Sequence, residues 1–305
     1  YYKVFNSFFK FDIVNCTLTN PNLNFMILIA DSGSTKTDWR LLLNGGDVIS
    51  FETKGFNPLF TDRQYIVNEI KSNQELMEMS NKVESIRYFG AGCSSNDRRA
   101  VVVSALADIF GSKDILVDHD MMGCAIALCQ GESGIANIIG TGSNSCYFDG
   151  GAHLVSHHGL GHILGDEASG SYFGKKLVAY FLYELMPSDL RAAFFEMFGT
   201  TKESALQNVY RETLPNVFLA SHAKFLSLHR GHPFIEDLLL KGFREFVETN
   251  VQSYPEHTSV PIHFTGSIAY HFRDVVQAVL EEKGLEAGNI IQKPITGLCE
   301  YYLKS

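Results

Sequence analysis

Two stretches in the middle of the chain combine glycines with hydroxyl, amide and carboxyl side chains. The apolar run Gly134–Ile139 ends in the turn Gly140–Asn144, and a second strand-like run, Ser145–Phe148, follows it. A glycine turn between two strands exposes several backbone N–H groups on one concave side, which suits a phosphate group. Further along, Gly159–Glu167 is a second small-residue stretch, and it ends in two carboxylates where a helix is expected to begin. Taken alone, these features also fit a plain glycine hairpin followed by a loop.

A related turn lies near the start of the chain. The short apolar run Met26–Ala30 has the character of a buried strand, and it leads into Asp31–Asp38, which reads DSGSTKTD. A mononucleotide P-loop needs G-x-x-x-x-G-K-[ST], and a dinucleotide fold needs G-x-G-x-x-G after its first strand. Neither spacing is present, so the sequence excludes both of those phosphate sites.

Two acids follow another predicted strand. Ile115–Val117 is followed by Asp118, His119 and Asp120, and then by the small-residue helix Met121–Cys129. A carboxylate at the carboxyl end of a strand and the start of a helix can serve as a general base or can cap the helix. A third small turn, Thr265–Ser267, ends the predicted strand Val260–Phe264.

The elements that position these residues follow a strand–helix alternation in the first half of the chain. Met26–Ala30, Trp39–Leu43 and Val48–Thr53 predict a three-stranded meander, with Asn44–Gly46 as a hairpin turn. Helices are then expected over 62–80, 97–110 and 121–129, and strands over 85–89 and 115–117. Strands that alternate with helices imply a parallel sheet that binds ligands at its carboxyl ends.

The second half repeats the strand, glycine turn and strand of the opening, and then turns strongly helical. Apolar residues recur at helical spacing, which predicts helices over 172–186, 189–198, 202–211, 217–228, 234–252, 268–283 and 294–303. Short strands are expected at 260–264 and 290–291.

Composition limits the class of protein. A chain of 305 residues fits two domains, and 45% hydrophobic with 19% charged residues is typical of a soluble globular protein. The net charge of −9 argues against a nucleic-acid surface, and no apolar stretch reaches membrane-spanning length. The six scattered cysteines form no C-x-x-C pair, which favours reduced core cysteines in a cytoplasmic protein. Residues 1–25 are rich in Asn and Phe and are interpreted as a leader or disordered arm, with an edge strand as the alternative.

The order of the three turns resembles that of the sugar kinase/Hsp70/actin superfamily. There, the turns at 31–37, 139–144 and 264–268 would be the first phosphate loop, the second phosphate loop and the adenosine motif. Together with Gly159–Glu167, the match narrows to the N-acetylglucosamine kinase group of the BadF/BadG-type ATPase family. The resemblance covers about residues 26–305 and implies an α/β fold of two RNase H-like (actin-like ATPase) lobes around a central cleft. It places one lobe at 26–132 and a larger one, with extra helices, at 133–305, and the last helix could pack back on the first lobe.

The resemblance also implies how ATP and Mg²⁺ are held. Asp31 would hold Mg²⁺ through water, which agrees with the preference of magnesium for oxygen ligands, although a turn aspartate can also cap its own backbone. The candidate ATP contacts come from the three turns and from one helix of the second lobe: Ser34, Thr35, Lys36, Thr141, Gly142, Ser143, Gly266, Ser267 and Ser221. For Ser221 an ordinary helix-surface position is the stronger interpretation.

The family's catalytic base is the Asp of a strand-end D-x-x-G, which Asp120–Gly123 matches, and Asp118 is the second candidate. Candidate sugar contacts are Asn57, Asp120, Gly159, Leu160 and Asp166. The human-type members of the family have Trp at the position of Leu160, so the pocket wall differs from theirs. The identity of the hexosamine therefore stays open. Glu167 could support the site or simply begin a helix.

The resemblance leads to an ATP-dependent amino-sugar kinase that acts as a cytoplasmic homodimer, with no nucleic-acid or membrane partner. His153, His157, His158 and His162 are interpreted as loop residues, because the cysteine segment of zinc-binding ROK kinases is missing. Two competing functions remain. One is an activator ATPase of the type that drives acyl-CoA dehydratases or reductases, whose cluster-binding cysteines are placed differently. The other is a nucleotide-binding module without catalysis.

Overall fold

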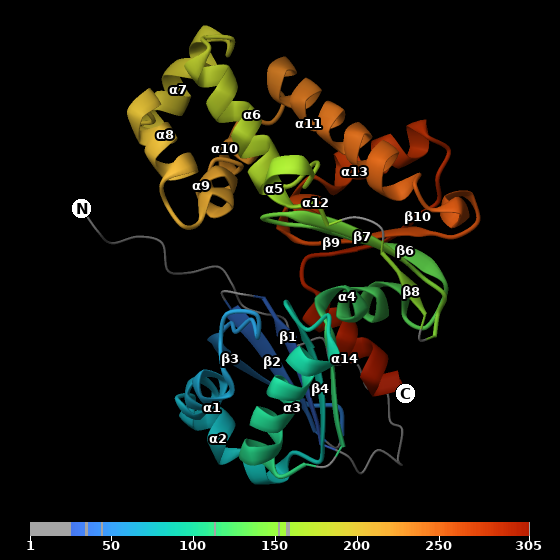
Figure 1. Ribbon diagram of the computed structural model, residues 1–305. Helices are drawn as coiled ribbons and strands as arrows, with labels where there is room; N and C mark the ends of the chain where they lie inside the picture. Colours follow the sequence, from blue (N-terminus) through green and yellow to red (C-terminus); the bar gives the residue numbers. More distant parts are fainter. Residues whose placement is uncertain are drawn as a thin grey trace.

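The computed structural model describes residues 26–33, 36–43, 45–112, 114–151, 153–156 and 159–304. The leader 1–25, the phosphate-turn candidates Ser34 and Thr35, and the histidines 157 and 158 lie outside the described residues. Figure 1 shows two lobes, each built on one sheet, with two helices between them. None of the helices in the described ranges is long and apolar enough to cross a lipid bilayer.

The first sheet has the order β3-β2-β1-β4-β5. Its strands are β1 Ile27–Ser32, β2 Lys36–Leu42, β3 Val48–Lys54, β4 Ser85–Gly90 and β5 Asp114–His119. The first three form the predicted antiparallel meander, and β4 and β5 add to β1 in parallel. The second sheet has the order β10-β9-β6-β7-β8: β6, β7 and β8 form an antiparallel meander, β9 pairs in parallel with β6, and β10 pairs in parallel with β9. Its strands are β6 Gly134–Ile139, β7 Ser143–Phe148, β8 Leu154–Val155, β9 Ile262–Thr265 and β10 Ala287–Ile291. The predicted α/β fold of two related lobes is therefore confirmed.

Helices cover the outer face of each sheet. On the first lobe these are α1 Arg63–Lys71, α2 Gln74–Glu78, the 3₁₀ turn Ser80–Lys82 and α3 Asn96–Phe110. The second lobe carries many more: α5 Gly161–Leu164, α6 Gly170–Leu182, α7 Ser188–Phe198, α8 Lys202–Tyr210, α9 Pro215–Ser221, α10 Lys224–Leu228, α11 Pro233–Phe246, the π-helix Val247–Val251, the 3₁₀ turn Pro255–Thr258, α12 Ser267–His271 and α13 Arg273–Glu282. Their apolar faces form the largest buried cluster of the molecule, which includes Phe173, Phe243 and Phe264.

Two helices lie between the sheets, α4 Asp120–Cys129 and α14 Pro294–Lys304 (Figure 1). Helix α14 leaves the second sheet after β10 and packs Ile295 and Leu298 against Ile29 and Leu42 of the first sheet. It also contacts α4 closely, because a Cβ added at Gly297 would collide with the carbonyl of Ala127. The last helix thus contacts the elements of both lobes.

Several predicted helices are divided in the structure. The expected helix 62–80 breaks because Asn73 accepts the backbone N–H of Leu76 and caps a new helix. The helix expected over 217–228 divides at 222–223. The helix expected over 268–283 divides at the buried Phe272. The helix expected over 234–252 ends in a π-helix. The glycine turn is shorter than predicted, because β7 already begins at Ser143.

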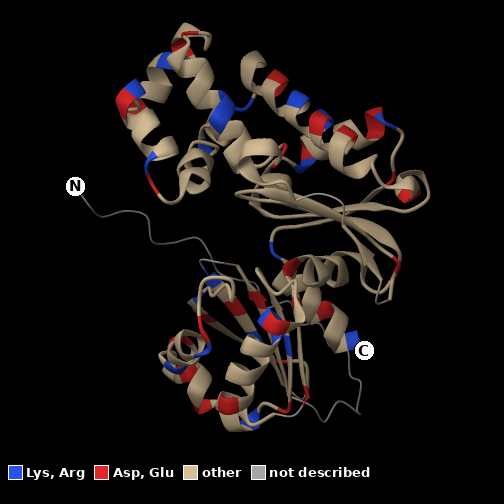
Figure 2. Cartoon of the chain, in the orientation of Figure 1, with Lys and Arg blue, Asp and Glu red and all other residues tan. Residues whose placement is uncertain are grey.

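Charged residues of both signs are interspersed along the outer helices (Figure 2). Some of them join α11 to its neighbours: Arg244 pairs with Glu282 of α13 at 2.7 Å, and Arg230, just before α11, pairs with Asp274 at 2.7 Å. Because these pairs are exposed, they add little stability individually and mainly orient the helices.

Candidate functional site

Three carboxylates gather at the carboxyl end of the first sheet. Asp31 on β1 lies directly opposite Asp38 on β2, and Asp120 begins α4. Burial, followed by the nearby charges of Asp38 and Asp120, raises the pKa of Asp31 to about 7, and Lys293 and Arg40 oppose this only partly. A carboxyl group that resists ionisation in this way lacks a sufficient countercharge.

Asp120 makes no ion pair and no hydrogen bond to another side chain among the described residues. Its Oδ1 accepts the N–H of Met121 at 3.0 Å, and burial raises its pKa against the effect of this bond. The residue that caps α4 is His119, whose Nδ1 accepts the N–H of Met122 at 3.2 Å. Helix capping, the structural alternative for Asp120, is therefore performed by its neighbour.

Asp118, the second candidate base, is already engaged. Its Oδ1 lies 2.8 Å from Arg99 Nη2 and accepts the backbone N–H of His119 at 2.7 Å. The same Arg99 donates from Nε to the carbonyl of Cys93 at 2.8 Å. Asp118 thus holds the end of β5 to the loop after β4, and the geometry favours Asp120 as the proton acceptor.

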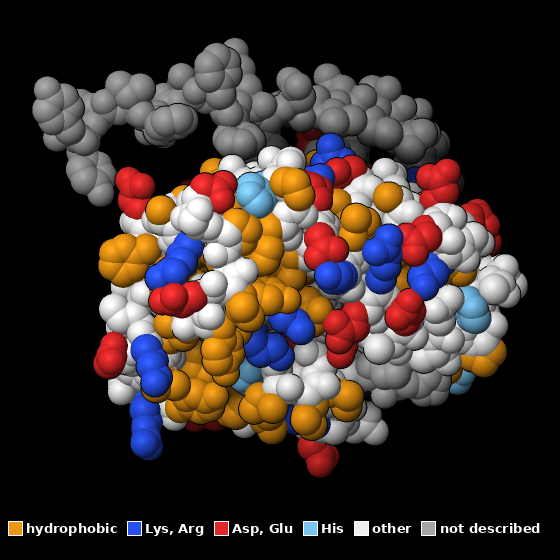
Figure 3. Space-filling view, turned by 90° about the horizontal axis from the view of Figure 1, so that it is seen from above, with side chains coloured by type: hydrophobic (Ala, Val, Ile, Leu, Met, Phe, Trp, Pro, Cys, Tyr) orange, Lys and Arg blue, Asp and Glu red, His pale blue; other side chains and the backbone are white. Residues whose placement is uncertain are grey.

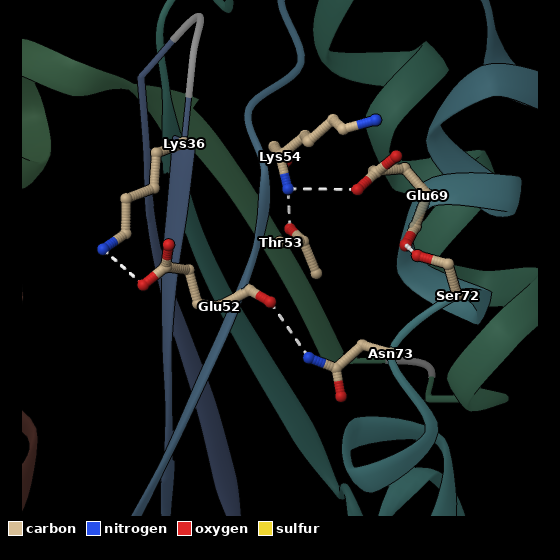
Figure 4. A pocket seen from close by; sticks show the side chains of 7 residues that line it. All are labelled: Lys36, Glu52, Thr53, Lys54, Glu69, Ser72 and Asn73. Carbon is tan, nitrogen blue, oxygen red and sulfur yellow. Dashed lines mark hydrogen bonds and ion pairs between the residues drawn. The ribbon is translucent and has the colours of Figure 1, made fainter. Parts of the chain in front are cut away.

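The structure describes the two ends of the first turn, at Gly33 and Lys36. The N–H of Gly33 donates to the Lys36 carbonyl at 2.9 Å, and the hydroxyls of Ser32 and Thr37 lie 2.7 Å apart. Figure 4 shows the Lys36 amine directed at Glu52, at 2.5 Å, beside a polar pocket of about 360 Å³ between β3 and α1. The same amine also lies 3.4 Å from Asp38. A contact between Lys36 and ATP phosphates stays a prediction.

The second turn is held from behind by α6. The first backbone N–H groups of that helix, from Gly170 and Ser171, donate to the carbonyls of Gly140 and Thr141 at 2.8 and 3.0 Å. A Cβ added at Gly140 would meet no atom within 4 Å, so the open side of the turn could admit a phosphate group. By contrast, a Cβ at Gly142 would lie 2.8 Å from the Asp166 carboxylate.

Asp166 therefore lies against the second turn. Its Oδ1 accepts the N–H of Ser143 at 3.2 Å, and the Ser143 hydroxyl donates to the Glu167 carbonyl at 2.8 Å. Burial raises the pKa of Asp166, while the Ser143 bond lowers it. Two stretches that are far apart in the predicted pattern, Gly140–Asn144 and Gly159–Glu167, thus form one unit.

The third turn joins the same unit. Gly266 has φ +106°, and a side chain there would collide with the Ile139 carbonyl, so the turn before α12 packs directly on the end of β6. Ser267 is the first residue of α12. Ser221 ends α9 on the surface, where its hydroxyl donates to the Phe218 carbonyl at 2.7 Å.

The remaining sugar-site candidates divide between the lobes. On the first lobe, Asn57 accepts the N–H of Leu59 at 2.9 Å and lies against Gly92, in the loop after β4. On the second lobe, Gly159 has φ +104° and lies close to Asn144, since a Cβ there would be 3.4 Å from the amide nitrogen of Asn144. Leu160 follows and is 61% exposed.

Helix α5, directly after Leu160, stands at the rim of an apolar groove of about 890 Å³ that α6, α8 and α9 complete. Figure 3, which looks down on the second lobe, shows hydrophobic side chains gathered over these helices. Among the clustered histidines, His162 accepts a bond from Lys175 at its carbonyl. Across the described part of the chain, no group of three or more His, Cys, Asp or Glu side chains could hold a metal ion by itself.

Sequence reasoning missed Asp38, His119 and Asn250 as members of the site. The alternation of Lys36, Asp38 and Arg40 on one strand was the available signal for Asp38. Nothing in the sequence pattern pointed to Asn250, which donates from Nδ2 to the Glu167 carboxylate at 3.0 Å from a distant helix.

Comparisons with known proteins agree with this architecture. No family profile matches the sequence, and no curated protein matches it either. A solved structure of a candidate N-acetylglucosamine kinase from Porphyromonas gingivalis is 37% identical, with a TM-score of 0.86 over 92% of this chain and 99% of that chain. A second candidate N-acetylglucosamine kinase, from Chromobacterium violaceum, is 18% identical, with a TM-score of 0.69 over 91% and 99% of the two chains. A ROK family glucokinase from Streptomyces griseus, solved with glucose and AMPPNP, is 13% identical, with a TM-score of 0.55 over 92% and 99%.

The repeated sheets and the two central helices define an actin-like ATPase fold, which the two more distant structures share. The 37% identity over nearly all of both chains shows the family. The chain belongs to the N-acetylglucosamine kinase-like sugar kinases of the actin-like ATPase superfamily.

Proposed function

We propose that the protein transfers the γ-phosphoryl group of MgATP to the 6-hydroxyl of N-acetylglucosamine or a closely related hexosamine. The observation that carries this proposal is the position of Asp120, a partly buried carboxylate directly after β5 whose helix is capped by His119. In the proposed step, Asp120 accepts the proton of the sugar hydroxyl, the hydroxyl oxygen bonds to the γ-phosphorus, and ADP leaves with the electrons of the broken P–O bond.

The residues present fit a nucleotide with its metal ion. The second turn offers an open side at Gly140, and Thr141, Gly142 and Ser143 surround it. Ser34, Thr35 and Lys36 would contact the phosphates from the first turn, and Gly266, Ser267 and Ser221 would lie near the adenosine. Asp31 would hold Mg²⁺ through water, since magnesium usually binds proteins through one or two carboxylates. When bound, the ion would supply positive charge for the phosphates, and it would favour the ionised form of Asp31.

The sugar would bind between the lobes. Asp166 and the backbones of Gly159 and Leu160 would contact it from the second lobe, and Asn57 and Asp120 from the first. Closure of the lobes would exclude water, because an open site would lose ATP to hydrolysis. Glucosamine, N-acetylmannosamine and muramic-type sugars are the alternative substrates. The family resemblance further leads us to propose a homodimer that works in the cytoplasm.

The activator-ATPase alternative requires cysteines that can reach a cluster shared between subunits. All five cysteines in the described ranges, Cys93, Cys124, Cys129, Cys146 and Cys299, are buried, and burial raises the pKa of each thiol. A cluster shared between subunits needs cysteines at an exposed surface, and none of these five is exposed. A brown, air-sensitive dimer would support this alternative, and ATP binding without sugar-dependent turnover would support a non-catalytic module.

The test is an ADP-release assay over a panel of hexosamines with wild type and Asp120→Asn. We expect sugar-stimulated turnover that falls by about 10²–10⁴ in the variant, because the general base is lost. ATP binding, measured by isothermal titration calorimetry, should survive. Asp118→Asn is the matched control, since it removes a carboxylate that already serves Arg99, and its effect on turnover should be much smaller. Equal activity of Asp120→Asn and wild type would remove Asp120 from the proposed role.

A further inference from the structure

The loop that carries Asp166 has a backbone that the chain would not adopt unaided. Asp166 and Ala168 both have left-handed dihedrals, with φ +60° and +56°, and neither is glycine. Ala168 is fully buried, so close packing surrounds this residue. Non-glycine residues remain in such a conformation only where surrounding contacts determine it, and such positions cluster at functional sites.

The residue between them, Glu167, is anchored at both ends. Its carbonyl accepts the Ser143 hydroxyl at 2.8 Å, and its Oε2 accepts Asn250 Nδ2 at 3.0 Å. The first anchor comes from the phosphate turn of the second lobe. The second comes from a helix more than eighty residues further along the chain.

Asn250 reaches Glu167 from an irregular helical turn. Helix α11 continues into the π-helix Val247–Val251, and the fourth residue of that turn is Asn250, which is 5% exposed. A π turn contains one extra residue, so it redirects a side chain that a regular helix would point elsewhere, and such turns are frequent at functional sites. The Asn250 amide also donates to the Thr249 hydroxyl at 2.9 Å, and Thr249 in turn donates to the Glu245 carbonyl at 2.7 Å. These two hydrogen bonds fix the orientation of the Asn250 amide that donates to Glu167.

We infer that Asn250 is a positioning residue that, through the Glu167 carboxylate, holds the strained Asp166–Ala168 loop against the phosphate turn. The inference rests on the proposed function for what Asp166 binds. When the anchor is lost, the two left-handed residues relax and the Asp166 carboxylate leaves Gly142 and Ser143. The consequence falls on the sugar, because Asp166 is the proposed sugar contact, whereas the phosphate turn is still held by Gly170 and Ser171 of α6.

The test exchanges donor and acceptor within the pair. Asn250→Asp places a second carboxylate beside Glu167 and replaces the hydrogen bond by repulsion. Adding Glu167→Gln returns one donor and one acceptor in the reverse order. Asn208→Ala is the matched control, since this asparagine donates to the Ser204 carbonyl within its own helix, α8, at 2.8 Å.

We expect Asn250→Asp to raise the KM for the sugar by about tenfold to a hundredfold, the size expected for losing a hydrogen bond to a charged group, with the KM for ATP much less changed. The double variant should return to within about threefold of wild type, since the two changes compensate directly. Amide hydrogen exchange of residues 165–169 should accelerate in Asn250→Asp and recover in the double variant. The control should leave all three measurements unchanged.

These measurements separate the two proposals. If wild type phosphorylates no hexosamine, the proposed function fails, and the exchange data still decide whether the pair holds the loop. If exchange in residues 165–169 is unaffected, or if Glu167→Gln does not restore it, the inference is wrong. If both KM values rise together, Asn250 supports the lobe generally and does not position Asp166.

Discussion

Asp118 and Asp120 lie two residues apart at the end of β5, yet their surroundings assign them different tasks. Arg99 and the His119 N–H compensate the charge of Asp118, so this carboxylate links two loops. Asp120 accepts the backbone N–H of Met121, and partial burial raises its pKa. A raised pKa brings a carboxyl group closer to the range in which general-base catalysis is most effective.

His263 is a second buried ionisable residue, remote from this chemistry. It lies on β9 between Gly134 and Gly288, whose lack of side chains leaves space for the ring. Its Nδ1 accepts the N–H of Asn289 at 2.9 Å, so Nε2 carries the proton, and Nε2 has no hydrogen-bond partner among the described residues. Burial lowers the pKa of His263 to about 4.

This lowered pKa predicts acid sensitivity. The unfolded chain binds the His263 proton below about pH 6.5, and the folded protein binds it only below about pH 4. Stability from this residue is therefore complete above pH 6.5 and is lost as the pH falls through this window. We expect the contribution of His263 to the free energy of unfolding to fall by about 2 kcal/mol between pH 7.5 and 5. Urea unfolding measures it as the difference between wild type and His263→Gln, because the raised pKa of Asp31 changes the total stability in the opposite direction.

The matched variants for that measurement are His263→Gln and His271→Gln. The first keeps an acceptor for Asn289 but removes the titrating ring, so its difference in unfolding free energy from wild type should change by about 2 kcal/mol over this range. The second changes an exposed histidine and should keep the wild-type slope. Identical slopes for His263→Gln and wild type would show that His263 does not cause the acid sensitivity.

At the scale of elements, the three glycine turns show that similar sequence patterns fulfil different structural requirements. Gly266 needs its positive φ and its missing side chain to pack on β6. Gly142 leaves room for Asp166. Gly140 has neither constraint, since an added Cβ meets open space and its φ is ordinary. The open space at Gly140 is the room that the proposed approach of a phosphate group requires.

Gly140→Ala should therefore separate binding from stability. We expect the unfolding free energy to stay within about 0.5 kcal/mol of wild type, the usual range for a substitution that creates no strain. ATP affinity, measured by calorimetry, should fall by up to about 10²-fold, since a methyl group would displace the phosphates from the turn. Gly151→Ala, in an exposed turn with comparable room, is the control and should change neither. Unchanged ATP binding in Gly140→Ala would argue against phosphate binding at this turn.

At the scale of the whole molecule, α14 and α4 are the elements that connect the two sheets. Gln130, directly after α4, donates from Nε2 to the carbonyls of Ala127 and Gly297, both at 2.8 Å, and thereby ties the two helices together. At the start of α14, Lys293 lies 3.2 Å from Asp38 on the first sheet. Any movement of one lobe against the other must be accommodated at this junction.

The junction can be tested through α14 alone. Gly297→Ala adds a methyl group against the Ala127 carbonyl, and we expect unfolding free energy to fall by about 1–3 kcal/mol from overpacking. This loss runs against helix propensity, which favours Ala over Gly by about 1 kcal/mol. Thr296→Ala is the control, because that residue is exposed on the same helix, and its unfolding free energy should be unchanged or slightly higher. A stabilised Gly297→Ala would show that the α4–α14 contact is looser than the structure indicates.

Much of this protein was determined by sequence pattern alone. Alternation of strands and helices predicted the α/β class, because strand periodicity and turn chemistry are local properties. The two lobes and the superfamily were implied by the resemblance of the three small-residue turns to those of the sugar kinase/Hsp70/actin superfamily. The lobe boundary at 132–133 stays a prediction. Helix breaks were missed where a single residue, such as Asn73, starts a new cap inside a continuous helical pattern.

The tertiary structure alone decided which acids share a site and what each one contacts. Asp38 faces Asp31 because of strand register, and Asn250 meets Glu167 because a π turn redirects it. Asp118 and Asp120 have the same chemistry and nearly the same position in the sequence, and only Arg99, from another helix, distinguishes them. Residue type and local pattern indicate what a side chain can do. Its ionisation and orientation depend on groups that folding brings from distant parts of the chain.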